Sequence, residues 1–455
     1  MKVAKFGGSS VSNAEQIKKV LDIVNADKDR KIIIVSAPGK RHKEDVKTTD
    51  LLLRLYEKVL AGIDYTAKKQ EIIQRYADII NDLEMSDDLL EQIDDTLESF
   101  IKQLKDKPER LQDALLSCGE NFNAQLIATY NNSRGIPTRY ISPGDAGITV
   151  TDLPQNAQVL DQSYEALYKL RDYDEKLIIP GYFGMSRQNY VVTFPRGGSD
   201  ITGAIVSRGV RADLYENFTD VSGIFRANPT IVPNPLSIDE ITYREMRELS
   251  YAGFGVFHDE ALQPLYKDRI PVVIKNTNRP NDTGTFIRHD REINSNNVVS
   301  GISCDKGFTV LSIKKYLMNR QVGFTRKVLG ILEDYNISFD HMPSGIDNIS
   351  IIMRSKEIEN VEQKVLNDIR QRCDVDELSV EHDLAILMIV GEGMHRIIGT
   401  ANMITHALAE SKINLRMMNQ GASEISMMFG IDVDDADKAV KATYEYCYNG
   451  EALQI

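Results

Sequence analysis

Short apolar runs alternate with amphipathic stretches over residues 1–295. The runs at residues 3–8 and 31–37 are rich in apolar and β-branched side chains, which predicts two buried strands. Between them, the apolar side chains from Ile17 to Val24 recur at helical spacing, so a helix is expected there. Strand, helix and strand in this order favour a parallel sheet with helices on its faces.

The rest of this region continues the alternation. Residues 48–130 have a helical pattern rich in Leu, Ile and charged side chains, with one expected break near Lys107 and Pro108. A helix is expected over residues 200–210, and further strands are expected at 137–142, 176–184, 190–194, 212–220 and 270–276. The pattern therefore predicts one large α/β domain over residues 1–295.

After about Asn294 the order changes to strand, helix, strand, strand, and this order occurs twice. The expected strands include residues 309–313, 337–343 and 347–353 in the first copy and residues 384–391 in the second. Residues 336–353 and 412–429 match at a constant offset of 76, as in Ile337 and Ile413, which indicates an internal repeat. We expect two related α+β domains, at residues 296–380 and 381–440, with residues 440–455 as a candidate segment for completing the first.

Composition narrows the classes of partner. Hydrophobic residues make up 42% of the chain and charged residues 27%, which is enough apolar material for packed cores. With 54 Lys and Arg against 67 Asp and Glu, the net charge is −13, and no basic patch that would offset it is evident. We therefore expect no nucleic-acid partner and no membrane partner. Any anionic ligand must be bound by a few placed cations, backbone amides or metal ions.

Cysteine and histidine spacing gives no sign of a metal site. The four cysteines are at least 69 residues apart, and the seven histidines form no HxH or HxxxH group. We expect no metal centre built from protein ligands alone. The chain begins without an apolar signal core, and reduced thiols are typical of a cytoplasmic protein.

Three glycine-containing motifs lie at the ends of predicted strands. Residues 5–11 (KFGGSSV) join a predicted strand to a predicted helix. Glycines at such a junction let backbone amides approach a phosphate, and a lysine at the strand end can reach the oxygens of a phosphoryl group that is being transferred. Residues 196–200 (RGGSD) precede the next helix, and an arginine is well shaped to hold a carboxylate. Residues 219–225 (TDVSGIF) end another strand. Each motif taken alone is explained by a turn.

Together with residues 117–120 (SCGE), these motifs resemble those of the aspartate kinases of the amino-acid kinase superfamily. Their order and approximate spacing match, and the resemblance covers essentially the whole chain. It implies an α/β amino-acid kinase fold, with a parallel-rich open sheet between helices, followed by two α+β ferredoxin-like ACT domains. It also implies a homodimer or a dimer of dimers through ACT pairing.

The resemblance implies transfer of the γ-phosphoryl group of ATP, with Mg²⁺, to the side-chain carboxylate of L-aspartate. The products are 4-phospho-L-aspartate and ADP, in the first step of lysine, threonine and methionine biosynthesis. The catalytic residues implied are Lys5, which holds the phosphoryl group, and Asp200, which orients Lys5 or positions the metal. The nucleotide and its phosphates are assigned to Lys5, Gly7, Gly8, Ser9, Thr219, Asp220 and Phe225.

The same resemblance assigns the substrate to Thr49, Glu120, Tyr182, Arg196, Gly197, Gly198 and Ser199. In this assignment Glu120 pairs with the ammonium group of aspartate and Arg196 grips a carboxylate. An amino-acid effector, either lysine alone or lysine with threonine, is assigned to Ser338, Phe339, Asp340 and Ser344.

Two alternatives stay open at this point. One is another amino-acid kinase, acting on glutamate or an N-acylated amino acid; Glu120 together with Arg196 favours a free α-amino acid instead. The other is a non-catalytic ACT-based amino-acid sensor with a degenerate kinase domain. The presence of Lys5, Glu120, Arg196 and Asp200 argues against it.

Overall fold

The computed structural model describes all residues except 196, 256, 258, 294–297, 422 and 449–455. The chain forms two compact units. Unit 1 comprises Met1–Ile224, Ser237–Arg247 and Gly255–Arg291, and unit 2 comprises Phe225–Leu236, Glu248–Phe254 and Glu292–Ile455. Among the described residues, no helix is both long enough and apolar enough to cross a membrane.

Unit 1 is built on an eight-stranded sheet in the order β11-β13-β12-β8-β1-β2-β5-β3. Most neighbours are parallel, and β13 runs antiparallel to β12. In chain order the strands are β1 (Lys2–Phe6), β2 (Arg30–Val35), β3 (Thr138–Tyr140), β5 (Lys176–Pro180), β8 (Leu214–Thr219), β11 (Glu240–Thr242), β12 (Val272–Asn276) and β13 (Thr285–Arg288). A smaller sheet holds β4 (Thr149–Val150), β6 (Phe183–Ser186) and β7 (Val191–Thr193), and β9 (Ile224–Phe225) and β10 (Ser237–Ile238) are two further short strands.

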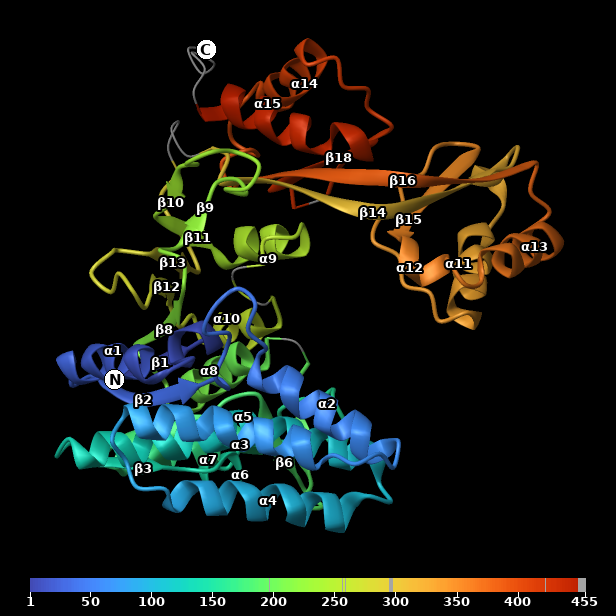
Figure 1. Ribbon diagram of the computed structural model, residues 1–455. Helices are drawn as coiled ribbons and strands as arrows, with labels where there is room; N and C mark the ends of the chain where they lie inside the picture. Colours follow the sequence, from blue (N-terminus) through green and yellow to red (C-terminus); the bar gives the residue numbers. More distant parts are fainter. Residues whose placement is uncertain (196, 256, 258, 294–297, 422, 449–455) are drawn as a thin grey trace. The chain divides into compact units, whose positions relative to one another are not determined.

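Ten α-helices are described between Met1 and Arg291. They are α1 (Ala14–Ala26), α2 (Thr48–Leu60), α3 (Thr66–Asp82), α4 (Asp88–Leu104), α5 (Pro108–Ser133), α6 (Pro143–Ala146), α7 (Gln162–Tyr168), α8 (Gly198–Gly209), α9 (Tyr243–Tyr251) and α10 (Leu262–Lys267). The expected helical region is confirmed as α2 to α5, which pack on one another (Figure 1). Pro108 begins α5, where its missing amide costs no helical hydrogen bond.

Residue alternation along β1 decides which side chain reaches which face of the sheet. Ala4 and Phe6 belong to the core formed with α1 to α5. Since side chains of a strand point alternately to opposite faces, Lys5 lies on the other face, where Asp200 of α8 meets it. The alternation thus buries two apolar side chains and turns the charged one toward α8.

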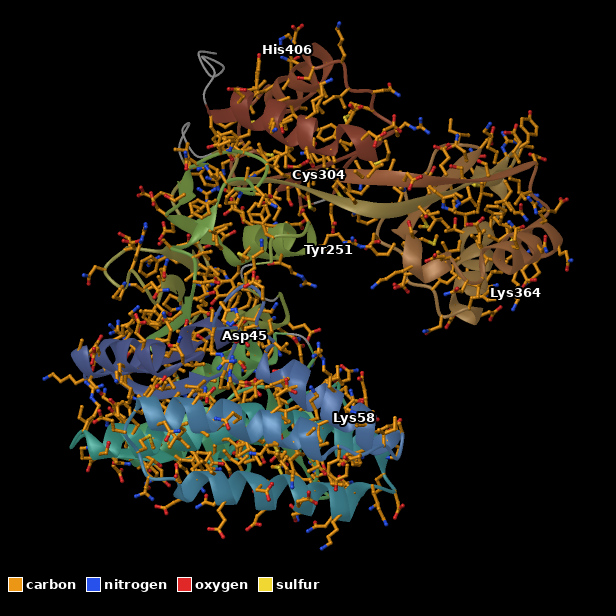
Figure 2. The ribbon with its side chains drawn as sticks, viewed as in Figure 1. Asp45, Lys58, Tyr251, Cys304, Lys364 and His406 are labelled. Carbon is orange, nitrogen blue, oxygen red and sulfur yellow. The ribbon has the colours of Figure 1, made fainter. Side chains whose placement is uncertain are left out.

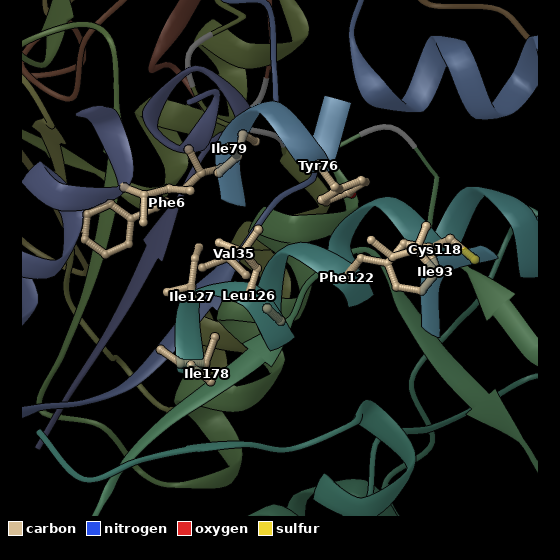
Figure 3. Close-up of a cluster of buried hydrophobic side chains, with 14 of the residues drawn as sticks. Phe6, Val35, Tyr76, Ile79, Ile93, Cys118, Phe122, Leu126, Ile127 and Ile178 are labelled. Carbon is tan, nitrogen blue, oxygen red and sulfur yellow. The ribbon is translucent and has the colours of Figure 1, made fainter. Parts of the chain in front are cut away.

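The core between the sheet and these helices is continuous. Figure 3 shows part of it, with Phe6 and Val35 from the strands and Tyr76 and Phe122 from the helices. The rings of Tyr76 and Phe122 meet edge to face, with 5.8 Å between centroids. The hydroxyl group of Tyr76 donates a hydrogen bond to the carbonyl of Gly119 at 2.8 Å, so this buried polar atom is satisfied.

Unit 2 contains a five-stranded antiparallel sheet in the order β15-β14-β16-β18-β17. Its strands are β14 (Gly301–Lys314), β15 (Asn348–Arg354), β16 (Glu377–Val390), β17 (Met417–Gln420) and β18 (Ser426–Asp432). Its helices are α11 (Phe324–Asp334), α12 (Ser355–Ile358), α13 (Glu362–Cys373), α14 (Thr400–Glu410) and α15 (Ala436–Tyr448).

The two long strands β14 and β16 serve both repeats. Residues 301–306 of β14 pair with residues 385–390 of β16, and residues 308–314 pair with residues 377–384. Separate cores form on α11 with α13 and on α14 with α15, and the latter core includes Tyr444. The domain limits expected from the sequence stay a prediction.

Some strand predictions differ from the structure. Residues 337–343 were expected to form a strand, yet only isolated bridges occur near this stretch, at His341 and Ser344, and Pro343 has no amide to donate to a ladder. The strand expected at 176–184 divides into β5 and β6, which lie in different sheets. Tyr182, between them, has a positive φ of 79°, which ends the extended backbone.

Candidate active site

A cavity of about 1280 Å³ lies at the carboxyl ends of β1, β2 and β8 in unit 1. This is the edge at which open parallel sheets bind ligands. Predicted site residues that line it are Lys5, Gly7, Gly8, Ser9, Thr49, Glu120, Tyr182, Gly197, Gly198, Ser199, Asp200, Thr219 and Asp220. Residues far apart in the sequence are therefore brought into one cleft.

The Lys5 ammonium group and the Asp200 carboxylate form an ion pair in this cleft. Lys5 Nζ lies 2.6 Å from Asp200 Oδ1, and both side chains are largely buried. Asn217 Nδ2 donates to the same oxygen at 2.8 Å. Asn217 stands beside Lys5 in the parallel pair of β8 with β1, so the strand register aligns all three side chains. Asn217 was not among the predicted site residues, because its position depends on that register.

The glycine motif after β1 forms a tight turn into a short 3-10 helix, Gly8–Val11. The Gly7 amide donates to the carbonyl of Phe218 at 3.1 Å, so it is already used within the protein. The first hydrogen bond of the short helix runs from Ser10 to the Gly7 carbonyl at 2.9 Å. The amides of Gly8 and Ser9 precede this bond and are therefore the ones suited to an anion.

Glu120 of α5 is a buried carboxylate whose Oε2 has no hydrogen-bond partner among the described residues. Its side chain is only 5% exposed, and it lines the cleft. Burial raises the pKa of Glu120 to about 8, against the lowering effect of a hydrogen bond from the Ala37 backbone. Burial disfavours the charged form of Glu120, and a cationic ligand group in the cleft would stabilise that form.

The turn into α8 needs small residues. Gly197 begins it with a positive φ of 78°, and a Cβ on Gly198 would lie 2.6 Å from Cδ2 of Tyr182. The Tyr182 amide donates to Oγ1 of Thr202 at 3.0 Å, which ties the backbone at Tyr182 to the helix. Arg196, the predicted carboxylate-binding residue, lies outside the described residues.

At the end of β8, backbone contacts hold the segment predicted to bind the nucleotide. Thr277 donates from its amide to the carbonyl of Thr219 at 2.9 Å, and Asn276 Nδ2 donates to the carbonyl of Asp220 at 3.2 Å. Phe225 belongs to unit 2 and is absent from the lining of the cleft in the described part of the chain. Its predicted contact with the nucleotide stays a prediction.

The predicted effector residues belong to the first repeat of unit 2. Ser338 and Phe339 line a cavity of about 560 Å³ beside the end of α11. The Asp340 carboxylate accepts a hydrogen bond from the hydroxyl of Tyr251, which Figure 2 labels. Ser344 forms an isolated bridge with Ile349. The structure thus places two of the four at this cavity and the other two in different local contacts.

The loop between β2 and α2 contributes further residues to the cleft. Lys40, His42, Lys43 and Lys47 line the cavity, although none of them was among the predicted site residues. The run 40–47 contains five basic residues among eight, which is the signal that could have found them. No group of three or more His, Cys, Asp or Glu side chains that could hold a metal ion occurs in the described residues.

Comparisons with known proteins match both parts of the chain. The model of the "Amino acid kinase family" matches residues 1–276, and that of an "ACT domain" matches residues 387–446. Aspartokinase 3 of Bacillus subtilis (strain 168) is 48% identical over 99% of this chain and 99% of its own length. The chain belongs to the aspartate kinases. It is therefore an enzyme, a phosphotransferase with a carboxyl group as acceptor.

Solved structures agree with membership in the aspartate kinases. The aspartate kinase of Clostridium acetobutylicum superimposes with a TM-score of 0.84 at 40% identity, covering 98% of this chain and 100% of that one. Aspartokinase III of E. coli, in complex with aspartate and ADP, gives a TM-score of 0.80 at 24% identity over 98% and 99% of the two chains, which shows a common fold. The expected fold class is confirmed, and these likenesses favour neither alternative left open by the sequence.

Proposed function

We propose that the cleft of unit 1 transfers the γ-phosphoryl group of ATP to the side-chain carboxylate of L-aspartate, giving 4-phospho-L-aspartate and ADP. One observation carries the proposal. The Lys5–Asp200 ion pair, suited to a transferring phosphoryl group, lines the same cavity as Glu120, a buried carboxylate suited to an amino acid's ammonium group. A site with both features can bind the two reactants together.

Positioning and charge neutralisation supply most of the catalysis when two anions react. Lys5 holds the oxygens of the transferring group, and Asp200 with Asn217 keeps Lys5 in place. The amides of Gly8 and Ser9 take the role expected of Gly7 and Gly8, because the Gly7 amide donates to the carbonyl of Phe218. No general base is required, because the carboxylate of aspartate is already ionised at neutral pH.

Mg²⁺ is the metal that this reaction calls for. It is usually held by one or two carboxylates together with the phosphates of the substrate, so a cage of protein ligands is unnecessary. The carboxylates of Asp200 and Asp220 both line the cleft and fit that requirement. When bound, the ion neutralises charge on the phosphate oxygens.

Substrate binding follows from the charges of aspartate. Glu120 pairs with the ammonium group, and Arg196 grips a carboxylate. Thr49, Tyr182, Gly197, Gly198 and Ser199 complete the substrate side, and Thr219, Asp220 and Phe225 the nucleotide side. The E. coli relative was solved with aspartate and ADP, which supports this choice of ligands.

We further propose an effector site in the first ACT repeat for lysine, alone or with threonine, at Ser338, Phe339, Asp340 and Ser344. Aspartokinase III of E. coli was also solved with lysine and aspartate in a T-state, which supports a lysine effector. Residues 1–295 form the catalytic domain in this proposal, and residues 296–380 and 381–440 form the ACT domains. The enzyme works in the cytoplasm as a homodimer or a dimer of dimers, at the first step of lysine, threonine and methionine biosynthesis.

An ADP-release assay tests the substrate. The enzyme is supplied with Mg-ATP and, in separate reactions, with aspartate, glutamate or N-acetylglutamate. We expect ADP formation that depends on aspartate and is far slower with the other two. A preference for glutamate or N-acetylglutamate would contradict the assignment.

A further inference from the structure

The loop between β2 and α2 carries the largest group of cations in the cleft. Lys40, Lys43 and Lys47 all line the cavity of about 1280 Å³, together with His42. In the described part of the chain, none of these three lysines forms an ion pair with a carboxylate, and the Lys40 ammonium group donates a hydrogen bond to the carbonyl of Lys43 at 3.5 Å. Three ammonium groups at one wall of an otherwise acidic protein form a local site for anions.

The neighbouring Arg41 is used differently. Its guanidinium group bonds to Asp45 Oδ2 at 3.0 Å through Nε and to Asp78 Oδ2 at 3.0 Å through Nη1. Arg41 is not among the residues that line the cavity. The loop therefore neutralises one of its cations within the protein and presents the lysines to the cleft.

A buried ion pair holds this loop against α3. Arg75 of α3 is 3% exposed, its Nη1 lies 2.6 Å from Asp45 Oδ2, and its Nη2 donates to the carbonyl of Gly39. Figure 2 labels Asp45 in the loop and Lys58 farther along α2. Burial would raise the pKa of Asp45, but hydrogen bonds from Arg41 and Arg75 hold it well below its usual range. Asp45 is therefore a charged partner for both arginines at neutral pH.

The loop is also joined to the glycine turn after β1. The Gly39 amide donates to the carbonyl of Gly8 at 2.9 Å, and a Cβ on Gly39 would lie 2.6 Å from the carbonyl carbon of Gly8. At the other end, the Thr48 amide donates to the carbonyl of Pro38 at 3.1 Å. A shift of the loop would therefore move the turn whose amides face the phosphates in our proposal.

We propose that Lys40, Lys43 and Lys47 bind the phosphate groups of the nucleotide, and that the Arg75–Asp45 pair positions the loop that carries them. The inference rests on the proposed function of the cleft. Phosphate is the anion of highest charge that the reaction requires, and lysine ammonium groups bind it as mobile point charges. The lysines are binding residues, while Arg75 and Asp45 act through the loop.

Nucleotide affinity tests the lysines directly. The dissociation constant of a non-hydrolysable ATP analogue with Mg²⁺ is measured calorimetrically for the wild type, for the triple variant Lys40→Gln/Lys43→Gln/Lys47→Gln, and for Lys58→Gln as a control of the same chemistry. We expect the triple variant to bind the analogue at least about 20-fold more weakly than the wild type, and the control to bind it equally well. When NaCl is raised from about 50 to about 300 mM, the triple variant should lose less affinity than the wild type. The corresponding arginine variants should retain affinity.

Unchanged nucleotide affinity in the triple variant would overturn the proposal, as would a rise confined to the KM for aspartate. The wild-type turnover with aspartate is recorded in the same preparation. Absence of that turnover would refute the proposed function. The affinity for the nucleotide tests the role of the three lysines independently of turnover.

The positioning pair is tested with Asp45→Asn and Arg75→Lys, which keep most of the buried volume. We expect the analogue to bind about 5-fold more weakly in each variant, with the KM for aspartate unchanged. Lysine cannot reproduce the contact that Arg75 makes through two nitrogens, and asparagine removes the charge that Arg75 pairs with. Thermal unfolding is measured alongside. A lower unfolding midpoint with unchanged nucleotide affinity would mean that the pair only stabilises the fold, and would overturn the positioning role.

Discussion

Glu120 has the most distinctive environment of any single residue in the cleft. Its carboxylate is buried, Oε2 has no partner among the described residues, and its pKa is raised to about 8. A folded-state pKa above the ordinary value means that the folded protein binds this proton more tightly than the unfolded chain. The free energy of unfolding therefore falls as pH rises from about 4.5 to about 8.

We predict that Glu120→Gln weakens the binding of aspartate and raises the stability of the protein above pH 8. The KM for aspartate should rise roughly 100-fold, since a buried charge pair with the substrate ammonium group is lost. The thermal midpoint without substrate should rise relative to the wild type above pH 8, and the increase of kcat/KM with pH should disappear. Steady-state kinetics and thermal unfolding across this pH range check both effects. Glu109→Gln, exposed on the same helix, is the control, and an unchanged pH profile in Glu120→Gln would contradict the account.

At the scale of elements, helix α8 carries Asp200 to the sheet through close packing. A Cβ on Gly203 of α8 would lie 2.3 Å from the hydroxyl oxygen of Tyr215 and 2.6 Å from Cζ of the same ring. Tyr215 on β8 is fully buried and donates a hydrogen bond to the carbonyl of Asp200 at 3.3 Å. The distance between helix and strand is thus linked to the position of the catalytic carboxylate.

Gly203→Ala should therefore lower the free energy of unfolding by about 1–3 kcal/mol, because the buried ring cannot move away. The same change should reduce kcat by up to about 100-fold, as Asp200 is displaced from Lys5. Gly330→Ala is the matched control: Gly330 lies within α11, where a Cβ would meet nothing within 4 Å. Denaturant unfolding and turnover are measured for both. Equal effects at the two positions would contradict the packing argument.

The whole molecule combines a kinase unit with a duplicated ACT unit, and regulation belongs to this scale. Asp340 accepts a hydrogen bond from Tyr251 at the last residue of α9, so an effector ammonium group would compete with that hydroxyl. We predict that Asp340→Ala raises the lysine concentration for half-inhibition by about 10-fold or more, with little change in the uninhibited rate. Inhibition curves with and without lysine check this, with exposed Asp434→Ala as control. Inhibition by lysine that stays as in the wild type would refute the effector placement.

The sequence predicted those parts of the molecule that depend on local pattern. The strand, helix, strand beginning, the helices from α2 to α5 and the clustering of Lys5, Glu120 and Asp200 all follow from periodicity and motifs. Other features depend on partners distant in the chain. Asn217 reaches Asp200 through strand register, and Arg75 reaches Asp45 through the packing of α3.

The repeat also hid a feature of its fold. Apolar residues at 309–313 and 384–391 predicted two ordinary strands, whereas β14 and β16 extend through polar residues and pair along both repeats. Hydrogen bonding to a neighbouring strand, rather than burial, extends them, and hydropathy does not record it. Residues 337–343, although apolar in part, form no continuous ladder, because Pro343 has no amide to donate.

The central claim is that Lys5, Asp200 and Glu120 form one site that phosphorylates the side chain of aspartate. The most direct measurement traps the acyl phosphate with hydroxylamine and compares the aspartyl hydroxamate formed with the ADP released, in the wild type and in Lys5→Ala. We predict equal amounts of the two products in the wild type, and a rate lower by about 10²–10³-fold in the variant. ADP release without hydroxamate, or a Lys5→Ala rate equal to that of the wild type, would contradict the account.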